Sequence, residues 1–398
     1  VAGNTHLIDF DLLTQMGLLK EADYASVNFG DDPTSVDYER VFYERRPILE
    51  IAVKNFLENQ SFQADFKHFE KSNRLWLDDF AEFMAIKEHF GNQALQKWDD
   101  KKAVARDPSA LEKYRTMLAE QIQYFKVTQY FFFKQWTELK NYANQKGIQI
   151  IGDMPIYVAA DSVEVWTKPE LFQLDEERNP LFVAGVPADQ FSATGQLWGN
   201  PLYAWEEHKK QGYAWWIHRI EESFKIYDVL RIDHFKGFSD YWQVDGKAEV
   251  AKDGSWQPGP GYNLFKAVKE QLGDLPIIAE DLGNIDDKAR KLLADCNYPG
   301  MKILQFGFED VSGKSLDSPH YCIPHSIVYT GTHDNDVTNG WYNGLTEQQQ
   351  QYINDYTHRR EDESICQAMI RQLFATVSNT AIATMQDVLD LPASSRMN

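Results

Sequence analysis

The sequence predicts an α/β protein in which a (β/α)8 barrel of the TIM type carries a large helical insertion. Short apolar runs alternate with helical segments from Ile148 onward, as in a parallel sheet covered by helices. Several of these runs end abruptly in acidic residues, which is typical of the catalytic face of such a barrel. No strand is followed by a Gly-x-Gly-x-x-Gly or phosphate-loop motif, so a doubly wound nucleotide-binding sheet is disfavoured.

The composition fits one large core and argues against polyanionic partners. The 398 residues are 43% hydrophobic and 14% aromatic, enough for a barrel of ~250 residues with insertions. The net charge of −20 opposes binding to nucleic acid or to an anionic membrane. The 11 Trp and 19 Tyr residues suit stacking against sugar rings, although most of them are expected in the core.

Cysteine spacing and hydropathy exclude several other classes of protein. Cys296, Cys322 and Cys366 lie far apart without a C-x-x-C pair, so neither a disulfide framework nor a zinc cage is indicated. No apolar run approaches the ~18 residues of a membrane span. The first residues lack the basic and apolar regions of a signal peptide, and we therefore expect a cytoplasmic protein.

The first part of the chain, 1–47, has mixed character with several turn signals, and we assign it to barrel connections and loops. Residues 48–147 follow as a helical insertion subdomain, which we expect to act as scaffold. Its apolar residues recur at spacings of three and four, and Gly147 supplies the stop signal. The clearest series is Leu118, Ile122, Phe125, Phe132, Trp136 and Leu139.

Residues 148–398 form the remaining catalytic barrel in this interpretation. A strand at 148–153 precedes a long segment, 157–205, which is rich in Gly, Pro and aromatics and is expected to be a functional loop or lid. The later predicted strands are 228–234, 276–281, 301–308, 326–334 and 381–389. The helices expected between them include one carrying Trp215 and Trp216, 263–272, 286–296, and two near 346–358 and 363–378. Six strands are counted where a closed barrel of this type needs eight, so two are missing.

Three carboxylates at strand ends form a candidate catalytic group: Asp233, Glu280 and Asp334. In a retaining glycosidase one carboxylate attacks the sugar and another carboxyl protonates the leaving oxygen. Arg231 lies two residues before Asp233 and therefore on the same side of the strand, where it would keep Asp233 ionised. Glu280 is then the acid that must stay protonated near neutral pH.

Each of these features also has a simpler interpretation. A lone Arg-x-Asp is most often a structural ion pair, and His234 and His333 are also explained as core histidines. The run His333-Asp334-Asn335-Asp336 offers oxygen and nitrogen ligands, but its spacing matches no known metal-binding loop. The coincidence of several acids at strand ends favours the catalytic interpretation, with no metal.

Several segments closely resemble motifs of the 4-α-glucanotransferases, the amylomaltases or disproportionating enzymes of glycoside hydrolase family 77. The resemblance runs in order over the whole chain. It rests on GDMPIY (152–157), GVPADQFSATGQLWGNPLY (185–203), RIDHF (231–235), IAEDLG (278–283) and GTHDND (331–336).

This resemblance implies transfer of glycosyl units between α-1,4-glucans, with maltooligosaccharides as substrates and no cofactor. It implies that Asp233 is the nucleophile, Glu280 the general acid/base and Asp334 the stabiliser of the transition state. The implied substrate-binding residues are Arg231, His333, His234, Asp153, Trp198, Asn200, Asp189 and Phe191, the last four in or near a loop that covers the substrate.

Two departures from the family pattern leave alternatives open. Ala188 and Gln190 stand where the family commonly has Pro and Tyr, which affects acceptor binding or loop stiffness. Family members also begin with two further strands and continue past Asn398, so we expect this chain to lack the first two strands and the C-terminal tail. The alternatives are therefore an α-1,4-glucan hydrolase with the same acids, or an inactive glucan-binding fragment.

Overall fold

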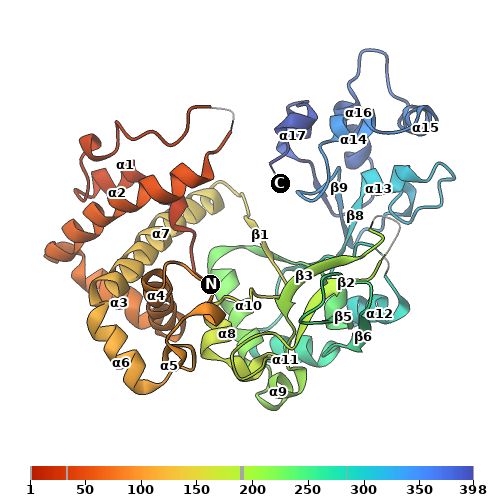
Figure 1. The fold of residues 1–398 in the computed structure, drawn as a ribbon. Coiled ribbons are helices and arrows are strands. Elements are labelled where there is room, and N and C mark those ends of the chain that lie inside the picture. Colours follow the sequence, from red (N-terminus) through yellow and green to blue (C-terminus); the bar gives the residue numbers. More distant parts are fainter. Residues whose placement is uncertain (1, 33–34, 189–191, 284, 398) are drawn as a thin grey trace. The chain divides into compact units, whose positions relative to one another are not determined.

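The computed structural model describes residues 2–32, 35–188, 192–283 and 285–397. The chain divides into two compact units, which Figure 1 colours along the sequence. Unit 1 comprises Val1–Gly152, Tyr157–Asp228 and Trp242–Gln257, and unit 2 comprises Asp153–Ile156, Val229–Tyr241 and Pro258–Asn398. Both helices and sheets occur, as expected for the α/β class.

Unit 1 begins with a group of helices that pack around the longest one, α7 (Figure 1). Phe56 lies at the centre, fully buried, with its ring 5.3 Å from those of Tyr130 and Phe131. The helices are α1 (Phe10–Gln15), α2 (Tyr38–Glu58), α3 (Gln63–Ser72), α4 (Arg74–His89), α5 (Lys101–Val104), α6 (Pro108–Met117) and α7 (Ala119–Gln145).

The helical region starts earlier than 48, because α2 begins at Tyr38 and continues through Pro47, inside the segment predicted as connections and loops. The helix tolerates this proline because residues after it bury one face, including Leu49, Val53 and Phe56. Asp37 caps the helix by accepting a hydrogen bond from the Arg40 amide at 3.0 Å. Tertiary packing here outweighs the local preference of proline.

The segment 157–205 is not an irregular loop. It contains α8 (Val163–Thr167), β2 (Phe182–Val186) and β3 (Gln196–Pro201). These strands join β5 (Asp240–Asp245) and β6 (Ser255–Pro258) in an antiparallel sheet of order β3-β2-β5-β6. Unit 1 also holds α9 (Trp205–Lys210) and α10 (Ala214–Ile226), the helix expected around Trp215 and Trp216.

Unit 2 is built on parallel strands. β4 (Val229–Ile232) pairs with β7 (Ile277–Ala279), and β9 (Ser326–Tyr329) lies between β8 (Gly300–Ile303) and β10 (Thr380–Ile382). β1 (Ile151–Met154) neighbours β4, and the Ala279 amide donates to the Pro299 carbonyl at 3.0 Å beside β8. The helices are α11 (Tyr262–Leu272), α12 (Asp287–Cys296), α13 (Leu304–Glu309), α14 (Thr338–Asn343), α15 (Glu347–Thr357), α16 (Ile365–Phe374) and α17 (Met385–Val388).

Two of the predicted strands are too long, because helices replace their second halves. The strand expected at 301–308 ends at Ile303, and α13 follows with Leu304, Gln305 and Phe308 buried at helical spacing. The strand expected at 381–389 ends at Ile382, and α17 begins where the Thr384 side chain accepts a hydrogen bond from the Asp387 amide. Short apolar runs do not distinguish a strand from the buried face of a short helix.

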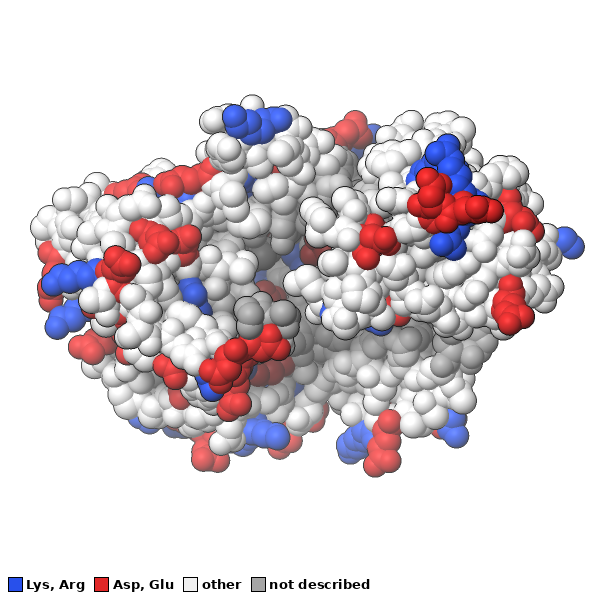
Figure 2. Space-filling view, turned by 90° about the horizontal axis from the view of Figure 1, so that it is seen from above, with Lys and Arg blue, Asp and Glu red and all other residues white. Residues whose placement is uncertain are grey.

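Acidic and basic side chains are interspersed on the face drawn in Figure 2, and neither sign forms a continuous field there among the described residues. Within those same residues, no helix combines the length and the hydropathy that a bilayer crossing needs.

Candidate active site

Two neighbouring strands of unit 2 place Asp233 and Glu280 at the same edge of the sheet. Ile232 of β4 is paired with Ala279 of β7, and each candidate acid is the next residue along its strand. The Glu280 amide donates to the Ile232 carbonyl at 3.0 Å, and the Asp233 amide donates to the Met154 carbonyl at 3.0 Å. Backbone pairing therefore fixes where both carboxyls leave the sheet.

Arg231 lies on β4, two residues before Asp233, and is only 6% exposed. Its Nη1 donates to Asp233 Oδ1 at 3.0 Å and to Asp153 Oδ2 at 2.6 Å. Burial alone would lower the pKa of Arg231, but the hydrogen bond and charge of Asp153 raise it. The expected ion pair is present, and it also holds Asp153.

Glu280 has a different environment, with neutral donors on both oxygens. The His234 amide donates to Oε2 at 2.8 Å and the Leu282 amide donates to Oε1 at 2.9 Å. Burial raises the pKa of Glu280 to about 7, and the negative charge of Asp233 adds to this rise. The two amide hydrogen bonds and the positive charge of Arg231 lower the pKa and offset part of the rise. A carboxyl with this pKa is protonated in about half of the molecules at neutral pH.

His234 shapes the turn that ends β4. Its backbone is left-handed, with φ 48° and ψ 50°, a conformation in which histidine is enriched among non-glycine residues. The turn brings its amide to Glu280 and starts a short 3-10 helix at Phe235. Burial lowers the pKa of the His234 ring to about 4, so the ring is neutral near pH 7.

The third candidate acid lies on the loop after β9, within the same unit. The His333 ring Nε2 is 3.4 Å from Asp334 Oδ2 and 3.9 Å from Asp153 Oδ2. Both side chains on this loop remain more than half exposed, 56% for His333 and 63% for Asp334. Arg396 Nη2 donates to the Asp334 carbonyl at 3.1 Å. Unit 2 thus brings together Asp153, Arg231, Asp233, His234, Glu280, His333 and Asp334.

Comparison with known proteins decides the family. The model of the 4-alpha-glucanotransferase family matches residues 1–398, the whole chain. This chain belongs to that family. A 4-alpha-glucanotransferase of Streptococcus pneumoniae is 52% identical over 398 residues, covering 100% of this chain and 78% of the relative. That of Clostridium butyricum is 43% identical over 401 residues, with 100% and 81% covered.

A solved structure leads to the same conclusion. The amylomaltase of Streptococcus agalactiae, in complex with acarbose, superposes with a TM-score of 0.98 at 59% identity. The match covers 100% of this chain and 80% of that one. The protein is therefore an enzyme of the 4-alpha-glucanotransferase family, and the resemblance recognised in its sequence motifs is confirmed.

Two of the other predicted site residues, Trp198 and Asn200, belong to unit 1. Trp198 lies on β3, 37% exposed, with its ring centroid 6.3 Å from that of Tyr157. Asn200 on the same strand donates from Nδ2 to the Val158 carbonyl at 2.9 Å. Asp189 and Phe191 lie outside the described residues.

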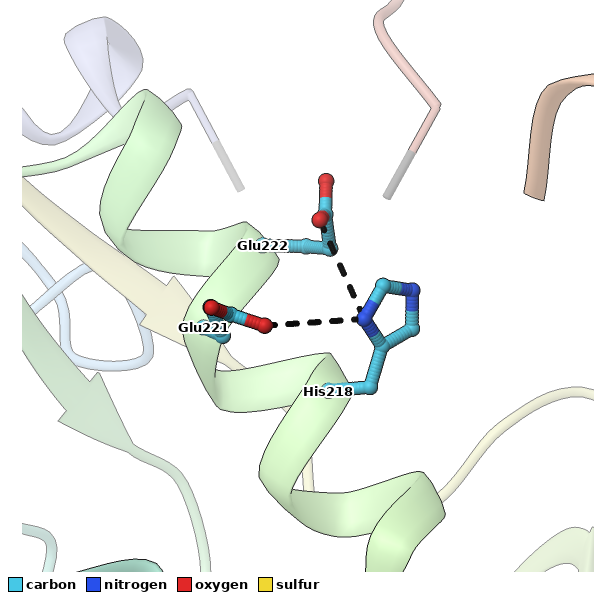
Figure 3. Close-up of side chains that lie close together, drawn as sticks. All are labelled: His218, Glu221 and Glu222. Atoms are coloured by element: carbon cyan, nitrogen blue, oxygen red, sulfur yellow. Dashed lines mark ion pairs between the residues drawn. The ribbon is translucent and has the colours of Figure 1, made fainter. Parts of the chain in front are cut away.

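One group of described residues has the spacing of metal ligands, and it lies on α10 (Figure 3). His218 Nδ1 is 3.8 Å from Glu221 Oε2 and 3.8 Å from Glu222 Oε1. Glu222 Oε1 is also ion-paired with Lys225, which supplies a positive charge where a metal ion would bind. The group is therefore best explained as a network of ion pairs along the helix.

Sequence reasoning missed three groups that hold the acids in place. Arg231 Nε donates to Met301 Sδ at 3.4 Å, and Met301 is only 1% exposed. The other two are the backbone amides of His234 and Leu282 that bind Glu280. A methionine in an apolar strand and a main-chain amide carry no sequence signal for such roles.

Proposed function

We propose that the protein transfers α-1,4-linked glucosyl or maltooligosaccharide units from a donor glucan to the 4-hydroxyl of an acceptor glucan. The mechanism is a retaining double displacement with Asp233 as nucleophile and Glu280 as acid/base. The contrast between the two carboxyls supports this most directly. Asp233 accepts a hydrogen bond from a guanidinium, whereas Glu280 accepts from two neutral amides and has a pKa raised to about 7.

In the first step an Asp233 oxygen forms a bond to the anomeric carbon of the donor. The glycosidic bond breaks, and the leaving oxygen takes the proton of Glu280. The ion pair with Arg231 holds the Asp233 carboxylate in place for this attack. Asp334 and His333 lie on the adjoining loop, where the carboxylate stabilises positive charge that develops on the sugar.

In the second step the glycosyl unit passes from Asp233 to the acceptor. Glu280, now ionised, removes the proton of the acceptor 4-hydroxyl, whose oxygen bonds to the anomeric carbon and releases Asp233. Arg231, Asp153, His234 and His333 line the donor sugar in this proposal. Further substrate-binding residues in this proposal are Trp198, Asn200, Asp189 and Phe191 of the segment 185–203.

We also propose that the six parallel strands belong to a (β/α)8 barrel. β1, β4 and β7 form one parallel run and β8, β9 and β10 another, with the Ala279–Pro299 hydrogen bond between them. A segment carrying the two further strands would complete the count of eight. In this arrangement residues 48–147 are an insertion and 148–398 supply the catalytic part.

The choice between transfer and hydrolysis is tested with maltotriose as the only sugar. Both reactions share the glycosyl-enzyme, and only the group that attacks it differs. We expect a ladder of longer oligomers together with glucose and maltose. Glucose and maltose without longer products would support the hydrolase instead, and no reaction with intact glucan binding would support the binding fragment.

The nucleophile is tested with Asp233→Asn, which keeps the shape of the side chain but removes its charge. We expect turnover to fall by at least about 10⁴-fold while maltooligosaccharide binding, measured by calorimetry, persists. Asp240→Asn is the matched control, because Asp240 is also in unit 2 but pairs with Lys288. A near-wild-type rate in Asp233→Asn would refute the assignment.

A further inference from the structure

We propose that Asp387 is a positioning residue that clamps both ends of the 331–337 loop, which carries His333 and Asp334. This proposal rests on the proposed function, in which Asp334 acts on the transition state. Asp387 lies on α17, in the segment that the sequence had suggested as the end of a strand. Among the described residues, its hydrogen bonds go to none of the proposed substrate-binding side chains, and it acts through the ends of the loop.

The contacts of Asp387 meet the loop where it begins and where it ends. Oδ2 accepts hydrogen bonds from Thr330 Oγ1 at 2.6 Å and from Thr338 Oγ1 at 2.9 Å. Oδ1 accepts from the Thr338 amide at 2.8 Å. Thr330 directly precedes the loop and Thr338 directly follows it, and both are fully buried. One carboxylate therefore ties the two ends of the loop together.

The burial and charge of Asp387 indicate a specific role. The residue is 2% exposed, and within the described part of the chain no Lys, Arg or His forms an ion pair with it. A buried carboxylate without a cation is costly unless hydrogen bonds satisfy it. Here two hydroxyls and an amide do so, and the buried Cys366 thiol lies 3.9 Å from Oδ1.

Further hydrogen bonds make Asp387 and the loop one assembly. The Thr384 side chain caps α17 by accepting from the Asp387 amide at 3.2 Å, which fixes the carboxylate against the helix start. The Thr332 amide donates to Asn335 Oδ1 at 2.8 Å, closing a tight turn around His333 and Asp334.

The catalytic side chains on this loop depend on its backbone. His333 and Asp334 are more than half exposed, and the turn closed by Asn335 determines where each side chain leaves the backbone. The loop that contains this turn is anchored at Thr330 and Thr338. A loosened anchor would misplace Asp334 without removing any group that touches the substrate.

The test uses Asp387→Asn, in which one acceptor oxygen becomes an amide that faces a donor. Because Asp334 acts in the transition state, we expect kcat for maltotriose disproportionation to fall on the order of a hundredfold with KM nearly unchanged. Thr338→Val, which removes one hydroxyl but keeps the shape and the amide, should lower kcat by a smaller factor. Thr338→Ser keeps the hydroxyl and should preserve activity.

A second substrate distinguishes a loosened loop anchor from the loss of proton donation by Glu280. An α-maltosyl fluoride donor needs no protonation of its leaving group, so in Glu280→Gln it should restore formation of the glycosyl-enzyme, measured as the first-turnover release of fluoride. It should not restore Asp387→Asn, whose defect lies in charge stabilisation. Asp390→Asn is the matched control, because this exposed carboxylate near α17 bonds to Asn339 and not to the loop ends.

The outcomes distinguish this proposal from the proposed function. A kcat for Asp387→Asn within about threefold of wild type overturns the clamp, as does recovery with the fluoride donor. If Asp387→Asn does not fold, the same criteria apply to Thr338→Val against Thr338→Ser, with their thermal midpoints measured alongside. Wild-type activity in Asp334→Asn would instead refute the stabiliser role itself.

Discussion

Replacing Glu280 with glutamine should change how the stability of the protein depends on pH. Burial raises the pKa of this carboxyl to about 7 from its ordinary 4.5. The folded state therefore binds the proton more tightly than the unfolded state does. The stabilisation from this proton is full below pH 4.5 and is lost as pH rises through about 7. Glutamine has no proton to lose, so the variant should lack this decline.

The size of the effect follows from the two pKa values. The difference between about 7 and 4.5, at about 1.4 kcal/mol per pH unit, gives about 3 kcal/mol. Because Glu280 keeps some contact with solvent, screening by water makes this free energy an upper bound. Glutamine also turns an amide group toward the His234 or Leu282 amide, which costs about 1 kcal/mol at every pH.

The assay is urea unfolding of both proteins between pH 5 and 8. The free energy of unfolding of Glu280→Gln minus that of wild type should rise by about 2–3 kcal/mol across this range. Glu363→Gln is the control, because the hydrogen bond from Arg371 lowers the pKa of Glu363 to about 2. The pKa of Glu363 lies below pH 5 in both the unfolded state, at 4.5, and the folded state, at about 2. The free energy of unfolding of Glu363→Gln minus that of wild type should therefore stay constant across this range. A flat difference for Glu280→Gln would refute the reasoning.

Two other variants, Arg231→Lys and Phe56→Ala, test separate parts of the structure. Arg231→Lys should lower kcat at least about tenfold, because lysine lacks the Nε that bonds to Met301 Sδ and orients the charged group toward Asp153 and Asp233; steady-state kinetics measures this. Phe56→Ala should lower the free energy of unfolding by about 3–5 kcal/mol in urea titrations, and Leu57→Ala, at 40% exposure, by less than about 1.

The strands that end in an acidic residue could be predicted from the sequence, because an apolar run followed by an acid is a local pattern. The apolar run before Asp233 and the one before Glu280 each form a strand, and the structure pairs them as neighbours. The ion pair of Arg231 with Asp233 also followed from the two-residue period of a strand. These features depend on residues that are close in sequence.

Features that depend on distant partners could not be predicted. The end of β8 at Ile303 is decided by burial of α13, whose Phe308 ring lies 5.2 Å from that of Tyr356. The strands β2 and β3 within 157–205 exist because β5, more than fifty residues after β2, supplies a partner for β2. The position of Asp387 was likewise invisible, because its partners lie about fifty residues away along the chain.

The main-chain bonds to Glu280 have a consequence for how this enzyme tolerates mutation. Side-chain substitutions at His234 and Leu282 leave the two amide donors in place, so the general acid keeps its anchor while neighbouring chemistry changes. Only proline removes an amide. Natural variation at these two positions can therefore adjust substrate preference at little risk to the acid, provided that His234 is replaced by a residue that accepts a left-handed backbone.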